Sequence, residues 1–426
     1  MTEVVEFEYM GYFQTALKGI SWMGALRVVT RSLALVKIAI LARILVPAQF
    51  GIYGIASLVL GFLEMLTETG INIFLIQKKE NPTSSRLRGT GIDEYVNSAW
   101  AVSIVRGFLI GTLIFVLAPF IASYFKNENA VFILYLVSVV PVIRGFINPS
   151  CVKYQKNLEF NKQFKYDSVI FFTDAVFAIG LGIITRSENS FVYAMIISTF
   201  LEVVLSFIYF EPKPKFAFEK TKTLEVINRG KWITGAGIFN YLFQNLDDIL
   251  VGRVLGTTSL GIYQQAYKIS TLPVSEVGEV FNKVTFPIYV NLKDDTARLK
   301  KAFNKTLLII SLFVIPFGFI VFRFPTEIIN FVLGSNWIAA APALQLLAIY
   351  GVVKAISNSF FSLFLGIGKQ EVVTYVTLIS TLILLAILYP LIMIFGILGA
   401  AYATIIATIL STPLTLYYYV KYFKTK

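Results

Sequence analysis

The chain has 426 residues, of which 56% are apolar and 15% are charged, and its net charge is +12. Soluble domains contain about a quarter charged residues, so this composition excludes a soluble protein. A single cysteine, Cys151, and the absence of histidine exclude a disulfide framework and histidine-based catalysis. We therefore expect no metal and no other cofactor.

Apolar stretches follow one another along the whole chain, and each matches the ~20 residues that a helix needs to cross a bilayer. They lie near residues 19–44, 51–76, 97–122, 130–152, 166–185, 191–210, 232–255, 260–288, 306–325, 338–364, 372–395 and 397–420. We predict an all-α integral membrane protein with twelve membrane-spanning helices joined by short loops.

Lysine and arginine are distributed unequally between alternate loops. With the N-terminus inside, the inner segments hold 24 of these residues and the outer loops hold three. Because basic residues in short loops are retained on the cytoplasmic side, both termini are predicted to be cytoplasmic. The net positive charge then reflects topology and contact with membrane lipids, and it does not indicate nucleic-acid binding.

The sequence contains an internal repeat. Residues 42–53 read ARILVPAQFGIY and residues 252–263 read GRVLGTTSLGIY, at an offset of 210. Near the ends of the two copies, residues 192–201 and 401–410 share six of ten residues. A duplication of this length divides the predicted helices into two sets of six.

The repeat predicts three parts: an N-terminal six-helix bundle, residues 1–210; a cytoplasmic linker, residues 211–231; and a C-terminal six-helix bundle, residues 232–426. An even number of spans gives both bundles the same orientation. Parallel repeats of this kind are found in transporters, where the substrate passes through a central cavity between the halves by alternating access. Duplication alone proves only common ancestry, which is the alternative interpretation.

Four arginines lie within predicted spans of the first half: Arg27, Arg31, Arg106 and Arg144. A charge in the bilayer core is costly unless it faces a cavity or a partner, so these residues are candidates for function. Guanidinium groups bind phosphate through paired hydrogen bonds, and we expect these arginines to contact an anionic substrate. The alternative is pairing within the protein, with Glu64, Glu68, Asp174 or Glu202 as partners.

The seventh span carries a polar stripe on one helical face, formed by Asn240, Gln244, Asp247 and Asp248. We expect Asn240 and Gln244 to contact substrate. The offset of 210 matches Lys37 with Asp247, which predicts an ion pair that forms and breaks during transport. Binding of a coupling cation by Asp247 or Asp248 is a second hypothesis, and a static ion pair is the structural alternative.

Glu276 and Glu279 in the eighth span are candidates for gating or ion coupling. The spacing to Lys283 equally favours simple support within one helix, through contacts between residues three and four apart. The chain has no phosphate-binding G-x-x-x-x-G-K-[ST] motif and no possible serine-histidine triad, so we predict that it is not an enzyme.

Several stretches resemble polysaccharide-biosynthesis (O-antigen) flippases of the Wzx type, across residues 15–420. They are ARILVPAQFGIYGIASLVLGFLEMLTETGINIFLIQKK, NLDDILVGRVLGTTSLGIYQQAYKI, FNKVTFPIYVNLKDDTARL, VLGSNWIAAAPALQLLAIY and GILGAAYATIIATIL. The resemblance implies an inner-membrane protein that moves a polyprenyl-pyrophosphate-linked oligosaccharide from the cytoplasmic to the outer leaflet for surface polysaccharide assembly. It also implies a polysaccharide polymerase and glycosyltransferases as partners.

Three other functions fit less well. A cation-coupled multidrug antiporter of the same superfamily would have a cavity rich in apolar and acidic groups, unlike the arginines of the first half. The lipid II flippase usually has fourteen spans. A membrane-embedded polysaccharide polymerase would need a large outer loop, whereas the longest predicted one, residues 323–337, is short.

Overall fold

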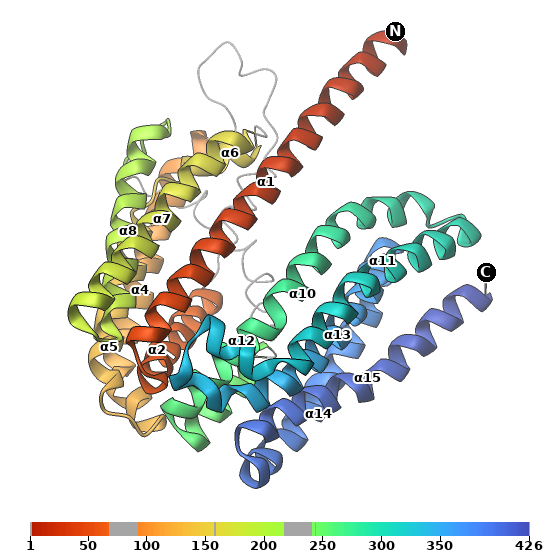
Figure 1. The fold of residues 1–426 in the computed structure, drawn as a ribbon. Coiled ribbons are helices and arrows are strands. Elements are labelled where there is room, and N and C mark those ends of the chain that lie inside the picture. Colours follow the sequence, from red (N-terminus) through yellow and green to blue (C-terminus); the bar gives the residue numbers. More distant parts are fainter. Residues whose placement is uncertain (1, 68–92, 157–158, 217–240, 243, 426) are drawn as a thin grey trace. The chain divides into compact units, whose positions relative to one another are not determined.

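The computed structural model describes residues 2–67, 93–156, 159–216, 241–242 and 244–425. Within these residues the regular elements are helices, without strands (Figure 1). The expectation of an all-α fold is therefore confirmed. In chain order, the helices up to residue 216 are α1 (Thr2–Ile44), α2 (Pro47–Leu66), α4 (Asp93–Tyr124), α5 (Ala130–Gly145), η2 (Pro149–Val152), α6 (Lys153–Lys156), α7 (Phe160–Thr185) and α8 (Asn189–Tyr209).

The described residues from 244 onward also form helices. Residues 244–255 are helical. They are followed by α10 (Thr257–Leu292), α11 (Thr296–Arg323), α12 (Pro325–Val332), η3 (Ser335–Ala340), α13 (Ala341–Gly366), α14 (Gln370–Phe395) and α15 (Ile397–Thr425).

Eight helical segments in the described residues are long and apolar enough to cross a membrane. They are Pro47–Leu66, Tyr95–Tyr124, Phe160–Thr185, Asn189–Tyr209, Thr296–Arg323, Ser335–Gly366, Gln370–Phe395 and Ile397–Lys424, and each overlaps a predicted span. Helix α1 is long enough, but it carries Arg27, Arg31, Lys37 and Arg43 within its apolar part. The predicted seventh span, residues 232–255, lies partly outside the described residues.

Helix α5 is shorter than its predicted span, residues 130–152. It has 16 residues and ends at Gly145. Asn148 has the extended backbone conformation that a following proline favours, with φ −67° and ψ 115°, and Pro149 then starts the short helix η2. The proline therefore ends the helix where hydrophobicity alone predicted its continuation.

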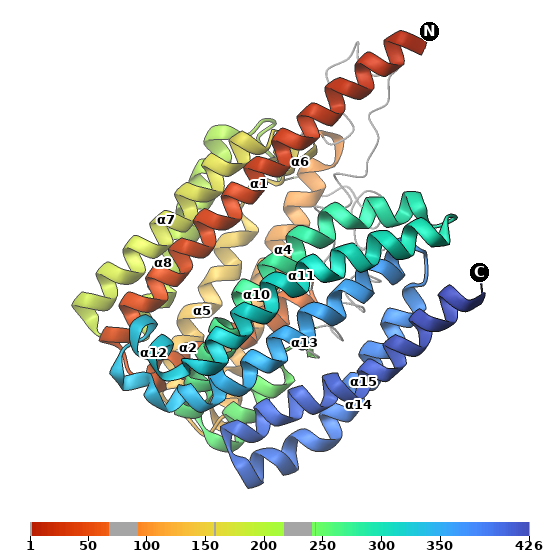
Figure 2. The same ribbon diagram turned by 45° about the vertical axis from the view of Figure 1, so that its right-hand side comes forward.

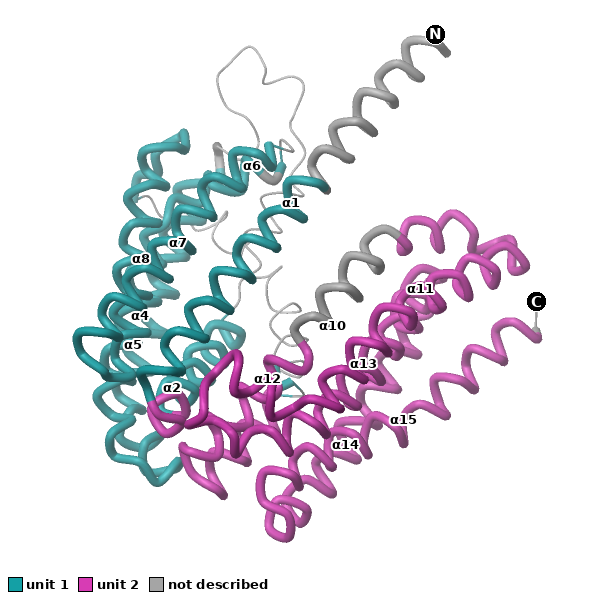
Figure 3. Tube along the Cα trace, viewed as in Figure 1, with its two compact units in different colours: residues 1–45, 52–244 teal, residues 46–51, 245–426 magenta. Residues whose placement is uncertain are grey.

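Two compact units make up the chain (Figure 3). Unit 1 contains residues 1–45 and 52–244, and unit 2 contains residues 46–51 and 245–426. The first residues of α2 therefore belong to unit 2, while the rest of this helix belongs to unit 1.

In unit 1, α1 packs on α7, α7 on α8, α8 on α5, and α5 on α4. Both views show α1, α7 and α8 side by side (Figures 1 and 2). Helices α4 and α5 come so close that a side chain on Gly107 would collide with the backbone oxygen of Pro141, and one on Gly145 with that of Ser103. Small residues at such contacts let membrane helices approach closely.

The end of α5 is tied to the end of α8 by the buried side chain of Asn148. Its amide donates to the carbonyl oxygens of Phe210 (3.2 Å) and Pro212 (3.3 Å), and its backbone N–H donates to Ser206 Oγ (3.0 Å). Its side-chain oxygen accepts from the backbone of Ser150 (2.9 Å). This network satisfies the polar groups of an irregular segment inside an apolar unit.

In unit 2, α13 is the central helix and packs against α10, α11, α14 and α15. Helices α14 and α15 lie side by side in both views (Figures 1 and 2). Phe303 of α11, Phe360 of α13 and Tyr419 of α15 form an aromatic cluster, with ring centroids 5.0 to 5.5 Å apart. Aromatic packing of this kind adds to the stabilisation from buried area.

The start of α2 crosses the start of α10 within unit 2, and the contact is reciprocal. A side chain on Gly51 would collide with the backbone oxygen of Thr257, and one on Gly261 with that of Pro47. Residues 257 and 261 are the repeat equivalents of 47 and 51, at the offset of 210. Each copy of the repeated glycine thus contacts the helix start of the other copy, as across a two-fold axis.

Candidate functional site: a charged cavity in unit 1

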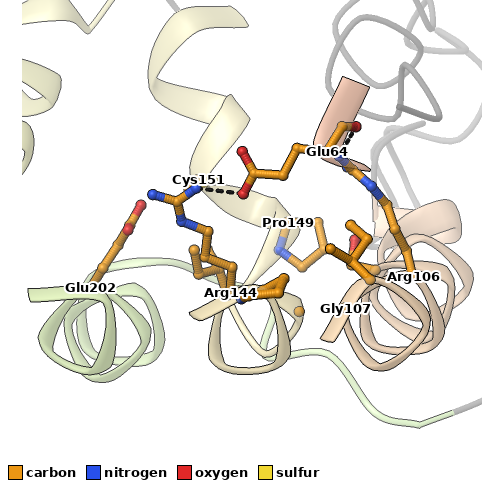
Figure 4. A pocket seen from close by; sticks show the side chains of 12 residues that line it. Glu64, Arg106, Gly107, Arg144, Pro149, Cys151 and Glu202 are labelled. Atoms are coloured by element: carbon orange, nitrogen blue, oxygen red, sulfur yellow. Dashed lines mark hydrogen bonds and ion pairs between the residues drawn. The ribbon is translucent and has the colours of Figure 1, made fainter. Parts of the chain in front are cut away.

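A cavity of about 320 Å³ lies between α2, α4, α5 and α8 in unit 1 (Figure 4). Its charged residues are Glu64 of α2, Arg106 of α4, Arg144 of α5 and Glu202 of α8. Apolar and small residues complete the wall: Gly107, Ile110, Pro141, Gly145, Ile147 and Pro149. Two of the four predicted arginines therefore line one cavity.

Arg144 forms an ion pair with Glu64. Its Nη1 lies 2.6 Å from Oε1 of the carboxylate, and both side chains point into the cavity (Figure 4). Arg144 stands in the last turn of α5, where a cation is favoured by the helix dipole. The alternative interpretation of pairing within the protein therefore applies to Arg144 in this structure.

Arg106 faces the same cavity and holds the end of α2. Its Nη2 donates to the backbone oxygen of Glu64 (2.9 Å), and its Nε donates to Oγ1 of Thr67 (3.2 Å). A helix end leaves carbonyl groups without partners in the helix, so a guanidinium is a suitable cap there. Arg106 and Arg144 thus converge on Glu64 from two helices.

Glu202 points toward Arg144 from the opposite side (Figure 4). Arg144 is therefore placed between two carboxylates, those of Glu64 and Glu202. Two guanidinium groups and two carboxylates in one cavity make a charge-balanced site. A phosphate can enter such a site by replacing a carboxylate as the partner of an arginine, because both are bidentate acceptors.

The other predicted cations of unit 1 lie on α1. Arg27 is half-buried and Arg31 is exposed, and neither lines the cavity. Lys37 forms an ion pair with Asp174 of α7, with 2.5 Å between Nζ and Oδ2. The observed partner of Lys37 is thus Asp174, and pairing of Lys37 with Asp247 stays a prediction.

A second polar cluster lies in unit 2, around Asp247 and Asp248. Tyr263 donates its hydroxyl to Oδ2 of Asp247 (2.7 Å), and Gln264 donates to Oδ2 of Asp248 (3.0 Å). Asp247 is 4% exposed. Both donors, Tyr263 and Gln264, belong to α10, and the expectation that the stripe faces a cavity stays a prediction.

Lys354 of α13 completes this cluster. Its Nζ donates to the hydroxyl of Tyr267 (2.9 Å) and lies 5.3 to 5.4 Å from the ring centroids of Tyr350 and Tyr267. Two tyrosine rings around an ammonium group stabilise a cation in an apolar setting.

The remaining predicted site residues give less information. Gln244 is exposed in the helical segment 244–255. Asn240 lies outside the described residues, and so do the side chains of Glu276 and Glu279, whose backbone belongs to α10. Their predicted roles stay predictions.

Comparison with known protein families shows to which family this chain belongs. Residues 40–342 match the family model described as polysaccharide biosynthesis protein. The chain belongs to the polysaccharide biosynthesis protein family. The resemblance seen in the sequence is thereby confirmed.

A curated relative of this polysaccharide biosynthesis protein is the lipopolysaccharide biosynthesis protein WzxC of Escherichia coli (strain K12). The two are 25% identical over 372 residues, which cover 85% of this chain and 72% of WzxC. The similarity therefore extends over both units.

Two solved structures share the fold of this polysaccharide biosynthesis protein. The lipid II flippase MurJ has a TM-score of 0.73 and 17% identity, over 94% of this chain and 88% of MurJ. A multidrug resistance transporter of the MATE family in the MOP superfamily has a TM-score of 0.69 and 13% identity, over 93% of this chain and 96% of that protein. The fold is thus that of multi-pass membrane transporters.

Sequence reasoning overlooked several residues of the two clusters in this family member. Cys151 lines the first site and Thr67 accepts a hydrogen bond from Arg106 there, and neither residue has a distinctive spacing in the sequence. Lys354 was detectable, because it is a lysine inside the predicted tenth span. Tyr263 and Tyr267 were also detectable, as hydroxyl groups four residues apart on one face of the eighth span.

Proposed function

We propose that this protein is a flippase for a lipid-linked oligosaccharide, which it moves from the cytoplasmic to the outer leaflet of the inner membrane. Membership of the polysaccharide biosynthesis family supports a glycan as the substrate. The fold shared with membrane transporters supports its movement across the membrane. The observation that carries the proposal is the cavity of unit 1, in which two arginines converge inside a bundle of apolar helices.

The arginines would bind the pyrophosphate that joins glycan and lipid. In the resting structure Arg144 is neutralised by Glu64. Entry of a phosphate would displace Glu64 and give Arg144 and Arg106 a shared anionic partner. Exchange of partners keeps the arginine charge compensated, and the displaced Glu64 carboxylate would have to be hydrated in the cavity or take up a proton.

Alternating access between two six-helix bundles, residues 1–210 and 232–426, joined by the linker 211–231, is the transport cycle that we propose. Both termini would lie in the cytoplasm. A polysaccharide polymerase and glycosyltransferases would consume and supply the carried lipid. Arg27, Arg31, Asn240 and Gln244 are further candidates for substrate contact along the path.

A multidrug antiporter is the second candidate, since the MATE fold is shared. The charges of the cavity argue against it. The cavity is charge-balanced, but its two guanidinium groups offer paired hydrogen bonds to the phosphates of an anionic carrier lipid, which an organic cation cannot accept. The family match also concerns polysaccharide biosynthesis.

Reconstituted vesicles test the proposal. A fluorescent polyprenyl-pyrophosphate oligosaccharide is placed in both leaflets, and the fraction accessible to an impermeant quencher is followed with time. The wild-type protein should make all of it accessible, and R106A/R144A should slow this at least tenfold. Arg323→Ala, which removes an arginine near the end of α11, is the matched control and should flip at the normal rate.

Equal flipping rates in wild type and R106A/R144A would reject the role of the cavity. Export of cationic dyes without any flipping of the oligosaccharide would reject the flippase itself.

A further inference from the structure

A second cavity, of about 400 Å³, lies in unit 2 where α13 ends and α14 begins, beside the last turns of α15. It shares no residue with the charged cavity of unit 1. The residues that matter here are Ile367, Lys369, Val372, Tyr375, Tyr418 and Lys421. Its lining combines an apolar wall, tyrosines, two lysines and one carboxylate, that of Glu371.

The wall is part of the core of unit 2 and is held rigidly. Phe364 and Val372, which are 1% and 4% exposed, belong to the main hydrophobic cluster of this unit. The end of α15 is fastened by two hydroxyl groups: Tyr419 donates to Oδ1 of Asn304 (3.1 Å), and Tyr422 donates to the backbone oxygen of Lys293 (3.3 Å). The cavity is therefore preformed.

The two lysines stand at the rim. The side chain of Lys369 is 52% exposed, and its Nζ lies 3.5 Å from Oε1 of Glu371. Lys421 is exposed, and its Nζ lies 5.8 Å from the ring centroid of Tyr417. An exposed ion pair is weak, so the ammonium group of Lys369 can turn toward an anion that enters the cavity, and Lys421 lines the same cavity.

An exposed apolar stripe leads away from the cavity along α14. Tyr375, Leu378 and Leu382 are 52%, 54% and 56% exposed, and their spacing of three and four places them on one face. The hydroxyl of Tyr375 has no hydrogen-bond partner among the described residues. Tyrosine at the end of a span is typical of the membrane interface, where its ring lies in lipid and its hydroxyl at the headgroups.

We propose that this cavity binds an anionic phospholipid of the leaflet that the lysine-rich helix ends face. Its phosphate would lie between Lys369 and Lys421 and accept a hydrogen bond from the hydroxyl of Tyr375, and an acyl chain would follow the stripe to Leu382. A basic pocket between membrane helices is the setting in which anionic headgroups bind. The continuous apolar stripe selects a lipid rather than free phosphate, which has nothing to place there.

Lipid binding to the purified full-length protein tests this inference. Native mass spectrometry counts bound phosphatidylglycerol during a titration, and phosphatidylcholine is titrated in parallel. Wild-type protein should prefer phosphatidylglycerol. Each lysine contributes about a fivefold change in affinity, so K369A/K421A should weaken phosphatidylglycerol binding by about 25-fold and leave phosphatidylcholine unchanged.

K300A/K301A is the matched control, because it removes two exposed lysines of α11 that do not line the cavity. It should bind phosphatidylglycerol like wild type. Equal weakening in both double variants would overturn the proposal, because it would indicate a general surface effect. Unchanged binding in K369A/K421A would also overturn it, and so would full displacement of the lipid by millimolar inorganic phosphate.

Discussion

Three charged side chains within the apolar helices have an ion-pair or hydrogen-bond partner from the same unit. Lys37 pairs with Asp174, Arg144 pairs with Glu64, and Asp247 accepts a hydroxyl from Tyr263. A partner that is fixed by the fold keeps the cost of a membrane charge low. Function at these sites then requires that a partner be exchanged and not simply removed.

The pair of Lys37 and Asp174 leads to a test by charge reversal. Lys37→Ala and Asp174→Ala should each lower the free energy of unfolding by about 1–3 kcal/mol, because each leaves a partly buried charge without its partner. The side chains of Lys37 and Asp174 are 18% and 20% exposed, so the expected loss is smaller than for breaking a fully buried ion pair. The exchanged variant K37D/D174K should recover most of the loss in thermal unfolding in detergent.

The same cycle addresses the pairing that the repeat suggested. If K37D is instead rescued by D247K and not by D174K, the functional partner of Lys37 is Asp247. The control is Lys300→Asp, an exposed residue of α11, which should change stability by less than about 0.5 kcal/mol.

Glycine contacts determine how the helices approach one another. Gly107 and Gly145 bring α4 and α5 together beside the cavity, and Gly51 and Gly261 form the reciprocal crossing of α2 with α10. In each case the neighbour is backbone, which cannot move aside as a flexible side chain can. Helix packing in this protein therefore depends on the absence of a few methyl groups.

The crossing of α2 and α10 predicts equal losses of stability on substitution at two positions that are far apart in the sequence. Gly51→Ala and Gly261→Ala should each destabilise the protein by about 1–3 kcal/mol, because the new methyl group meets a backbone oxygen. Their effects should not add in the double variant, since either one alone separates the helices. Thermal unfolding in detergent measures this.

Gly24→Ala is the matched control. Gly24 lies in α1 with open space around it, so its replacement should be neutral or slightly stabilising, as in an ordinary helix. Additive losses at Gly51 and Gly261 would show that they do not share one contact.

For the whole molecule, the distribution of lysine and arginine predicts which helix ends face the cytoplasm. This can be measured with a thiol reagent that does not cross membranes. In a Cys151→Ser background, which removes the single cysteine, Glu128→Cys should react in intact cells, because it follows the end of α4 that is predicted to face outward. Lys300→Cys should react only after the membrane is opened.

Labelling of both positions from outside would contradict the predicted orientation. Cells treated with detergent before labelling serve as the positive control, in which both cysteines must react to the same extent.

The order and nature of the elements could be predicted from sequence, because apolar length is enough to indicate a membrane helix. Eight of the predicted spans coincide with long apolar helices in the described residues. The end of α5 could not be placed by hydrophobicity, since Asn148 and Pro149 determine it through backbone geometry and hydrogen bonds. Arg106 and Arg144, which line the cavity, were named from the sequence, and Glu64 was one of four carboxylates named as alternative partners, but the sequence could not indicate which of the four lies beside them.

Composition, hydrophobic length and the repeat by themselves determined that this protein is helical, lies in a membrane and is built from duplicated halves. The first two properties follow from the transfer of single side chains between water and lipid, which depends on residue type alone, and the third follows from the matched residues of the repeat. Only the tertiary structure decided which charges meet, because Arg144 and Glu64 are 80 residues apart and no periodicity relates them. The same holds for Lys37, whose partner depends on how α1 packs on α7.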